Sequence, residues 1–354
     1  MKNTTTRVVL AVLAFCALLV LLSPADHAAR AKNERAVPAN IRITPPAPVI
    51  TDKERVAELK QRRDRVAQSV GPQSLLVLFS SEPRVYANDV YYPYRQENNL
   101  YYLTNLKQKG ATLVLLPGNT KTREILFIPR RNALAETWTG HMYSPEEAHQ
   151  LSGVSEIWQA SEFDPFIKAL RNRQPYRPKP ENVFMSELPP TTTLSNDHGF
   201  ASLFEAAAKG EAGLHLLVPG GNESREYNYE QRFAAEWVQT ASGYSIKNAW
   251  PIFTRMRLVK SPLELRILQH AIDISIEAHQ RAWAGAADAK WEYEVDAIVA
   301  YTFKLRNADN WGYPDIVGCG PNATTLHYIE SQGPVEPTDL LLMDVGAEYD
   351  HYTA

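Results

Sequence analysis

Cysteine is scarce in this chain of 354 residues, where Cys16 and Cys319 are the two present. Cys16 lies inside an apolar N-terminal stretch with the character of an export signal, so Cys319 alone would remain after cleavage. One cysteine cannot form an internal disulfide, even in an oxidising compartment. With 44% hydrophobic and 22% charged residues, the chain has enough apolar material for two domains that rest on their cores.

An excess of positive charge is also missing. The 37 Lys and Arg residues are balanced by 40 Asp and Glu residues, and the net charge is −3 at pH 7. No run of basic residues is interleaved with aromatic residues. Because nucleic-acid binding needs a basic surface, nucleic acid is not an expected partner. Small molecules and peptides remain open as partners.

The N-terminal apolar run, residues 8–22, is shorter than the roughly 20 residues that a membrane helix needs. Basic residues precede it, and Ser-Pro follows it. This pattern predicts a signal peptide over residues 1–31, cleaved after Ala25 or Ala31, and an exported protein, periplasmic or secreted. No stable membrane span is then expected after cleavage. A retained membrane anchor is the alternative.

Several short catalytic and binding motifs are absent. The chain has no HExxH, CxxC or EF-hand spacing, which disfavours zincin proteases, zinc fingers and calcium hands. It has no G-x-S-x-G turn around a serine nucleophile and no glycine-rich phosphate loop. Nucleophilic catalysis and nucleotide binding therefore lack a candidate site.

Alternating helical and strand patterns indicate a mixed α/β domain over residues 53–250, after a proline- and alanine-rich linker over residues 32–52. The apolar periods and turn residues place its elements. The expected helices are residues 53–70, 144–151 and 161–171. The expected strands are residues 74–79, 112–117, 124–129, 214–219 and 244–250.

Residues 251–354 predict a second domain of α+β type. Ser261-Pro-Leu-Glu264 is a capping box with proline at the first helical position, and the helix that it opens is expected to end at Gly285. A second helix follows around residues 295–303. The remaining expected strands are residues 315–317, 324–329 and 340–345. This second domain is expected to be incomplete, because the pattern ends in the middle of a sheet.

The apolar strand that ends on Asp344 is a candidate metal-binding element. A buried strand that ends on a carboxylate and turns at Gly346 can hold the anion at a cavity wall, where a cation would offset its desolvation. The plainer interpretation is that Asp344 caps a turn. His327, flanked by Leu326 and Tyr328 on an expected strand, is either catalytic or a structural side chain.

Four stretches across both domains occur in a recognisable order. They are Tyr92-Pro-Tyr-Arg95-Gln96 with the following residues to Thr104, Glu136-Thr-Trp138-Thr-Gly140, Arg257-Leu-Val-Lys260-Ser-Pro262-Leu-Glu264, and Leu326-His327-Tyr328 followed by Met343-Asp344-Val-Gly346. Together they resemble the proline-specific metallopeptidases of the pita-bread fold, most closely the aminopeptidase P (Xaa-Pro aminopeptidase) family. The resemblance covers about residues 53–354.

The resemblance implies an N-terminal domain of the creatinase and aminopeptidase P type, followed by a pita-bread catalytic domain. It also implies a homo-oligomer and two divalent metal ions, usually manganese, held by two aspartates, a histidine and two glutamates. Asp344 matches the first aspartate, and the second would fall one residue beyond Ala354. His327 matches a histidine that is not a ligand but would hydrogen-bond the scissile amide or its transition state, in a catalytic and substrate-binding role.

The implied activity removes the N-terminal residue from peptides with proline second, by attack of a metal-bound hydroxide on the scissile amide. Two ions about 3.5 to 4 Å apart can hold that hydroxide and polarise the carbonyl. A chain that ends at Ala354 lacks most of the ligands and is expected to be inactive. The alternatives are a prolidase, which accepts dipeptides, and a non-catalytic peptide-binding or scaffold relative. Asp344 argues against creatinase, which has the fold without the metals.

Overall fold

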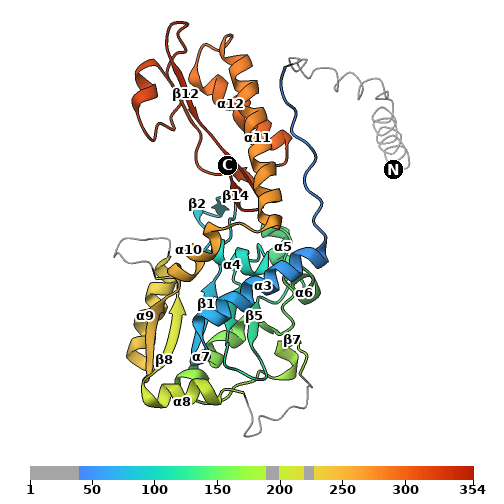
Figure 1. Ribbon diagram of the computed structural model, residues 1–354, viewed down its shortest axis with the longest axis vertical. Helices are drawn as coiled ribbons and strands as arrows, with labels where there is room; N and C mark the ends of the chain where they lie inside the picture. Colours follow the sequence, from blue (N-terminus) through green and yellow to red (C-terminus); the bar gives the residue numbers. More distant parts are fainter. Residues whose placement is uncertain (1–39, 189–198, 219–226) are drawn as a thin grey trace, which may run out of the picture. The chain divides into compact units, whose positions relative to one another are not determined.

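The computed structural model describes residues 40–188, 199–218 and 227–354 (Figure 1). The predicted signal peptide lies outside these residues. The chain divides into two compact units. We call Pro48–Ile267 the sheet unit, and the part up to Ala47 together with Leu268–Ala354 the C-terminal unit. The domain borders predicted from the sequence stay predictions.

A seven-stranded mixed sheet forms the centre of the sheet unit. Its order is β7 (Val183–Met185), β6 (Ile157–Gln159), β5 (Glu124–Ile128), β4 (Thr112–Leu115), β1 (Ser74–Phe79), β8 (Ala212–Leu216) and β9 (Tyr244–Asn248). The β5–β6, β1–β8 and β8–β9 pairs are parallel, and the other pairs are antiparallel. The five strands expected from the sequence are confirmed, and β6 and β7 were not expected.

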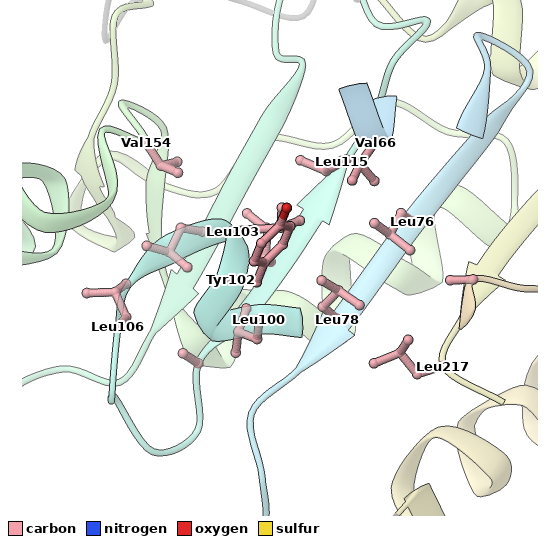
Figure 2. Close-up of a cluster of buried hydrophobic side chains, with 14 of the residues drawn as sticks. Val66, Leu76, Leu78, Leu100, Tyr102, Leu103, Leu106, Leu115, Val154 and Leu217 are labelled. Atoms are coloured by element: carbon pink, nitrogen blue, oxygen red, sulfur yellow. The ribbon is translucent and has the colours of Figure 1, made fainter. Parts of the chain in front are cut away.

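Both faces of the sheet are covered. Successive side chains of a strand point to opposite faces. Leu76 and Leu78 of β1 therefore enter one apolar cluster, shown in Figure 2, whereas Leu75 and Val77 enter another. All six residues of β1 are buried as a result. This two-sided burial explains why the strand is an unbroken apolar run rather than an alternating one.

Helices from different parts of the sequence cover the two faces. The helices of the sheet unit are α3 (Asp52–Val70), α4 (Asn98–Thr104), α5 (Ala133–Thr139), α6 (Pro145–Ser152), α7 (Phe163–Arg171), α8 (Ala201–Lys209), α9 (Asn228–Thr240) and α10 (Trp250–Leu258). α3, α4, α6 and α10 contribute to the cluster of Figure 2, and α7, α8 and α9 contribute to the other cluster. A short exposed hairpin, β2 (Val85–Ala87) and β3 (Val90–Tyr91), precedes α4.

Two helices and two small sheets make up the C-terminal unit. Its helices are α11 (Pro262–Ala286), which begins in the sheet unit, and α12 (Glu292–Leu305). Its strands are β10 (Asn310–Trp311), β11 (Ile316–Cys319), β12 (Leu341–Asp344), β13 (Ala347–Tyr349) and β14 (Tyr352–Thr353). β11 pairs with β12, and β10, β13 and β14 form an antiparallel sheet. Apolar residues of α11, α12 and the strands form one core, with Ile274, Val299 and Val317 fully buried.

The predicted capping box at the start of α11 is confirmed. The Ser261 backbone N–H donates to the Glu264 carboxylate at 2.8 Å, and the Glu264 N–H donates to the Ser261 hydroxyl at 3.2 Å. These reciprocal bonds satisfy two backbone donors that the first helical turn leaves without partners. Among the described residues, no helix combines the length and apolar character needed to cross a membrane.

The strand predicted over residues 324–329 is wrong. Residues 320–324 form a short 3-10 helix, Gly320–Thr324, closed by the Thr325 N–H donating to the Asn322 carbonyl at 3.0 Å. A turn at residues 326–327 follows. Pro321 at the first turn favours this helical conformation, because proline fixes its φ and lacks an N–H. The apolar residues that suggested a strand, Leu326 and Ile329, are exposed instead.

Candidate active site

Asp344 is the last residue of β12, opposite Ile316 of β11. The expectation of a buried strand is wrong for β12, where exposure alternates and Asp344 itself is exposed. Leu341 and Met343 pack against the core and are partly buried, whereas Leu342 and Asp344 are exposed, so one face of β12 is open to solvent. The carboxylate therefore needs no cation to offset burial.

Tyr313 is the hydrogen-bond partner of Asp344. Its hydroxyl donates to Asp344 Oδ1 at 2.6 Å. Burial, and then the adjacent Asp344 carboxylate, raise the pKa of Tyr313 to about 12, so the phenol stays protonated and remains a donor at neutral pH. This bond fixes one oxygen of Asp344 and leaves Oδ2 as an oxygen that a ligand could approach.

His327 lies in the turn after the 3-10 helix and is exposed. Its neighbour Tyr328 is held by a hydrogen bond from its hydroxyl to Glu292 at 2.7 Å. In the described residues no hydrogen bond joins His327 to Asp344. The structure thus places both predicted site residues in the C-terminal unit, without a direct hydrogen bond between them in the part of the chain that it describes.

The described residues do not form a metal site by themselves. They contain no group of three or more His, Cys, Asp or Glu side chains that could hold a metal ion. One exposed carboxylate supplies too few oxygens for a divalent ion, which takes about six ligands. The roles predicted for Asp344 and His327 therefore stay predictions.

Asp315, directly before β11, was not identified from the sequence. Its Oδ1 is buried and has no hydrogen-bond partner among the residues that the structure describes. Burial, together with the charge of Asp296 on α12, raises the pKa of Asp315 to about 7. A single acidic residue before an apolar strand is too common in sequences to indicate such an environment.

Two family models match this chain, one in each part. The model of the aminopeptidase P N-terminal domain matches residues 59–177, and the model of metallopeptidase family M24 matches residues 266–354. The Xaa-Pro aminopeptidase of Haemophilus influenzae is 29% identical over 296 residues, which are 83% of this chain and 58% of the relative. The chain therefore carries an aminopeptidase P N-terminal domain followed by a region of metallopeptidase family M24, and it is similar to Xaa-Pro aminopeptidases.

Other known proteins are similar to this chain over most of its length. The Xaa-Pro aminopeptidase of Escherichia coli is 27% identical over 83% of this chain and 59% of its own length. The solved structure of Escherichia coli aminopeptidase P in its low-pH form has a TM-score of 0.65 and 24% identity. That match covers 87% of this chain and 61% of the solved one. A putative aminopeptidase P from Bacillus anthracis has a TM-score of 0.66 at 22% identity.

The predicted fold class is confirmed. An aminopeptidase P N-terminal domain of mixed α/β type comes first, and an M24 pita-bread domain follows it. The chain spans 58% of the length of the Haemophilus influenzae relative and 59% of that of the Escherichia coli relative.

Proposed function

We propose that this chain takes part in a metal-dependent aminopeptidase that releases the N-terminal residue from peptides with proline in second position. The ordered presence of both domains carries the proposal, because relatives named Xaa-Pro aminopeptidase match across 83% of the chain. Export and assembly into a homo-oligomer belong to the same proposal.

In this proposal Asp344 is one ligand of a pair of divalent ions, and manganese fits because its ligands would be mostly oxygen atoms. When bound, such ions polarise a carbonyl and lower the pKa of water. The further ligands would come from sequence that follows Ala354. Tyr313 would orient Asp344 through its 2.6 Å hydrogen bond, and His327 would donate to the carbonyl oxygen of the scissile amide.

Proline in second position explains why a dedicated peptidase is needed. The bond before proline is a tertiary amide without an N–H, so a peptidase that binds this donor cannot hold such a substrate. A side chain that reaches the carbonyl or the ring nitrogen has to replace that contact. His327 is exposed and can present its imidazole to a ligand.

The test begins with the gene sequence beyond codon 354, which shows whether an aspartate, a histidine and two glutamates follow. The protein with that sequence is then assayed on Xaa-Pro-Yaa, Xaa-Pro and Xaa-Ala-Yaa peptides, before and after chelation and with manganese restored. We expect turnover of Xaa-Pro-Yaa that chelation abolishes and manganese restores. Turnover of the dipeptide alone would identify a prolidase instead.

Asp344→Asn is the variant that tests the predicted ligand, with Asp339→Asn as its matched control. Asp339 is an exposed aspartate five residues earlier in the same part of the chain. We expect the Asp344 variant to lose at least a hundredfold in kcat/KM and the Asp339 variant to retain it. Full activity of Asp344→Asn would refute the ligand role, and metal-independent peptide binding without turnover would favour a non-catalytic relative.

A further inference from the structure

Glu292, the first residue of α12, carries a buried carboxylate in the C-terminal unit. The residue is 0% exposed. Taking a carboxylate out of water is costly unless hydrogen bonds or a counter-charge replace the lost hydration. The groups that replace the lost hydration of Glu292 are neutral hydrogen-bond donors, and they all belong to one segment of the chain.

Four donors converge on this carboxylate. Oε1 accepts from the Cys319 N–H at 2.6 Å and from the Asn322 side-chain amide at 3.0 Å, and Oε2 accepts from the Tyr328 hydroxyl and the Gly333 N–H, both at 2.7 Å. Burial alone would raise the pKa of Glu292, but these hydrogen bonds lower it, so the group is ionised at neutral pH.

The four donors enclose the turn that carries His327. Cys319 ends β11, Asn322 lies in the 3-10 helix, and Gly333 closes the segment. Residues 325–332 belong to no helix or strand. A segment of this kind lacks the ladder of backbone hydrogen bonds that fixes regular structure, so side-chain contacts must fix it.

Tyr328 connects the carboxylate to the histidine most directly. Its hydroxyl donates to Glu292 and accepts from the Gln332 N–H at 3.1 Å and from the Asn322 amide at 3.0 Å. These hydrogen bonds fix the hydroxyl end of the Tyr328 side chain. His327 is the residue directly before Tyr328 in the chain. The backbone that carries the exposed imidazole is therefore anchored one residue away from His327.

Stabilising the first turn of α12 does not account for the hydrogen bonds that Glu292 accepts. Acidic residues in the first turn of a helix stabilise it by accepting from free backbone N–H groups nearby. Glu294 does this in α12, where its carboxylate accepts from the Lys290 N–H at 2.6 Å and the Trp291 N–H at 3.1 Å. The oxygens of Glu292 instead accept from residues 27 to 41 positions away.

We propose that Glu292 is a positioning residue that holds the turn at residues 325–332 and so orients His327 toward substrate. The role of His327 rests on the proposed function, whereas the hold on the turn does not. The ionised form is required, since Gln has one acceptor oxygen and would turn its NH₂ toward at least one of the donors.

The test compares Glu292→Gln with Glu294→Gln, which changes the same residue type in the same helical turn. In the 354-residue chain, amide hydrogen exchange is followed at Cys319 and Gly333, and NMR relaxation is followed at the His327 imidazole. We expect exchange at Gly333 to quicken at least tenfold and the imidazole to gain mobility in Glu292→Gln. Both should stay within twofold of the parent in Glu294→Gln. Unchanged exchange and relaxation in Glu292→Gln would overturn the proposal.

Tyr328→Phe keeps the proposal testable if Glu292→Gln does not fold. This variant removes the hydroxyl but leaves the bonds of Glu292 to Cys319 and Gly333. We expect amide exchange at Gly333 to stay slow while the His327 imidazole becomes mobile. General unfolding would instead speed the exchange and free the imidazole together. An imidazole as ordered as in the parent would contradict the link through Tyr328.

Activity separates this inference from the proposed function. In a protein that turns over Xaa-Pro-Yaa peptides, we expect Glu292→Gln and Tyr328→Phe to lower kcat/KM at least tenfold, with Glu294→Gln near the parent. A loosened turn with full turnover would overturn the orienting role. Absence of turnover in the parent would count against the proposed function alone, since exchange and relaxation would still decide whether Glu292 holds the turn.

Discussion

His215 on β8 is a histidine in an environment that disfavours its charge. It is 8% exposed, and neither ring nitrogen has a hydrogen-bond partner in the described part of the chain. Burial, and then the positive charge of Lys247, lower the pKa of His215 to about 4. The unfolded chain protonates this residue near pH 6.5, so acid favours the unfolded state.

We predict that the sheet unit loses stability as the pH falls from about 6.5 to about 4, on the order of 1–2 kcal/mol from this residue after allowance for partial access of water. His215→Leu should remove that part of the loss, and Lys247→Met should reduce it. Urea titrations at pH 7.5, 6, 5 and 4 measure the effect. An unchanged pH dependence in His215→Leu would contradict the assignment.

Sequence patterns identified residue types more reliably than residue environments. Asp344 was found because it ends an apolar run, yet its exposure was predicted wrongly. An apolar run predicts a strand, but burial depends on how many strands and helices cover it. Leu340 and Leu342 of that run are exposed. Glu292 gave no signal, because the donors that converge on it come from residues far along the chain.

Residues 40–47 lie along α11 through polar contacts, although the sequence predicted a linker over residues 32–52. Arg42 pairs with Asp273 at 2.6 Å, and the Thr44 N–H donates to Glu277 at 2.7 Å. Glu277 also accepts two bonds of 2.7 Å from Arg306 and one of 2.8 Å from Arg281. Proline-rich composition indicates a linker, but it carries no information about which residues the segment contacts.

We predict that Glu277→Gln destabilises the C-terminal unit by about 2–4 kcal/mol, because a buried carboxylate between two arginines is removed. Asp273→Asn is the control and should cost about 1 kcal/mol or less, since Arg42 is half exposed. Burial acts to raise the pKa of Glu277, but hydrogen bonds from Arg306, Thr44 and Arg281 lower it to about 2.

The pH dependence provides an independent check on Glu277. A carboxylate with a lowered pKa stabilises the fold above its unfolded value near 4.5, and this stabilisation disappears as the pH falls toward 2. The gap in free energy of unfolding between parent and Glu277→Gln should therefore be constant from pH 8 to 5 and shrink below pH 4. A gap that stays constant down to pH 2 would show that lost packing, not charge, causes the effect.

The capping box at the start of α11 leads to a smaller effect. Ser261→Ala removes the hydroxyl that accepts from the Glu264 N–H. We expect a loss of about 1 kcal/mol in the free energy of unfolding, as is typical of an N-cap. Ser144→Ala in the matching capping box of α6 should give a similar loss. Circular dichroism during urea titration measures both, and an unchanged midpoint in both variants would contradict the role of the caps.

Local signals explain which elements were predictable. The strand at residues 74–79 was predicted with the bounds that β1 has, and Ser-Pro-x-Glu located the start of α11, because these signals lie within a few residues of one another. The prediction of a strand over residues 324–329 failed because Pro321 favours a 3-10 helix and because Tyr328 and Gly333 bond to Glu292, a residue outside that segment. Contacts across long separations in sequence override local preference at such positions.

Strand order was the least predictable property of the whole molecule. β1 lies between β4 and β8, and Ser74 pairs with Gly213 although most of the sheet unit separates them in sequence. Apolar periods show where strands lie but not which strands pair. The ordered family motifs gave the fold because they identify a whole architecture at once, as the matches to both family models confirm.

Metal binding needs more ligands than the described residues bring together. The described residues offer Asp344 as one exposed carboxylate and no group of three ligands. We predict that the 354-residue chain and its Asp344→Asn variant bind manganese equally weakly in calorimetric titrations, because one carboxylate supplies too few oxygens. In a protein that carries the further ligands, the same substitution should weaken manganese binding at least tenfold, because the site then has one carboxylate ligand fewer. Tight binding of manganese by the 354-residue chain, lost in Asp344→Asn, would show that residues already present complete the site.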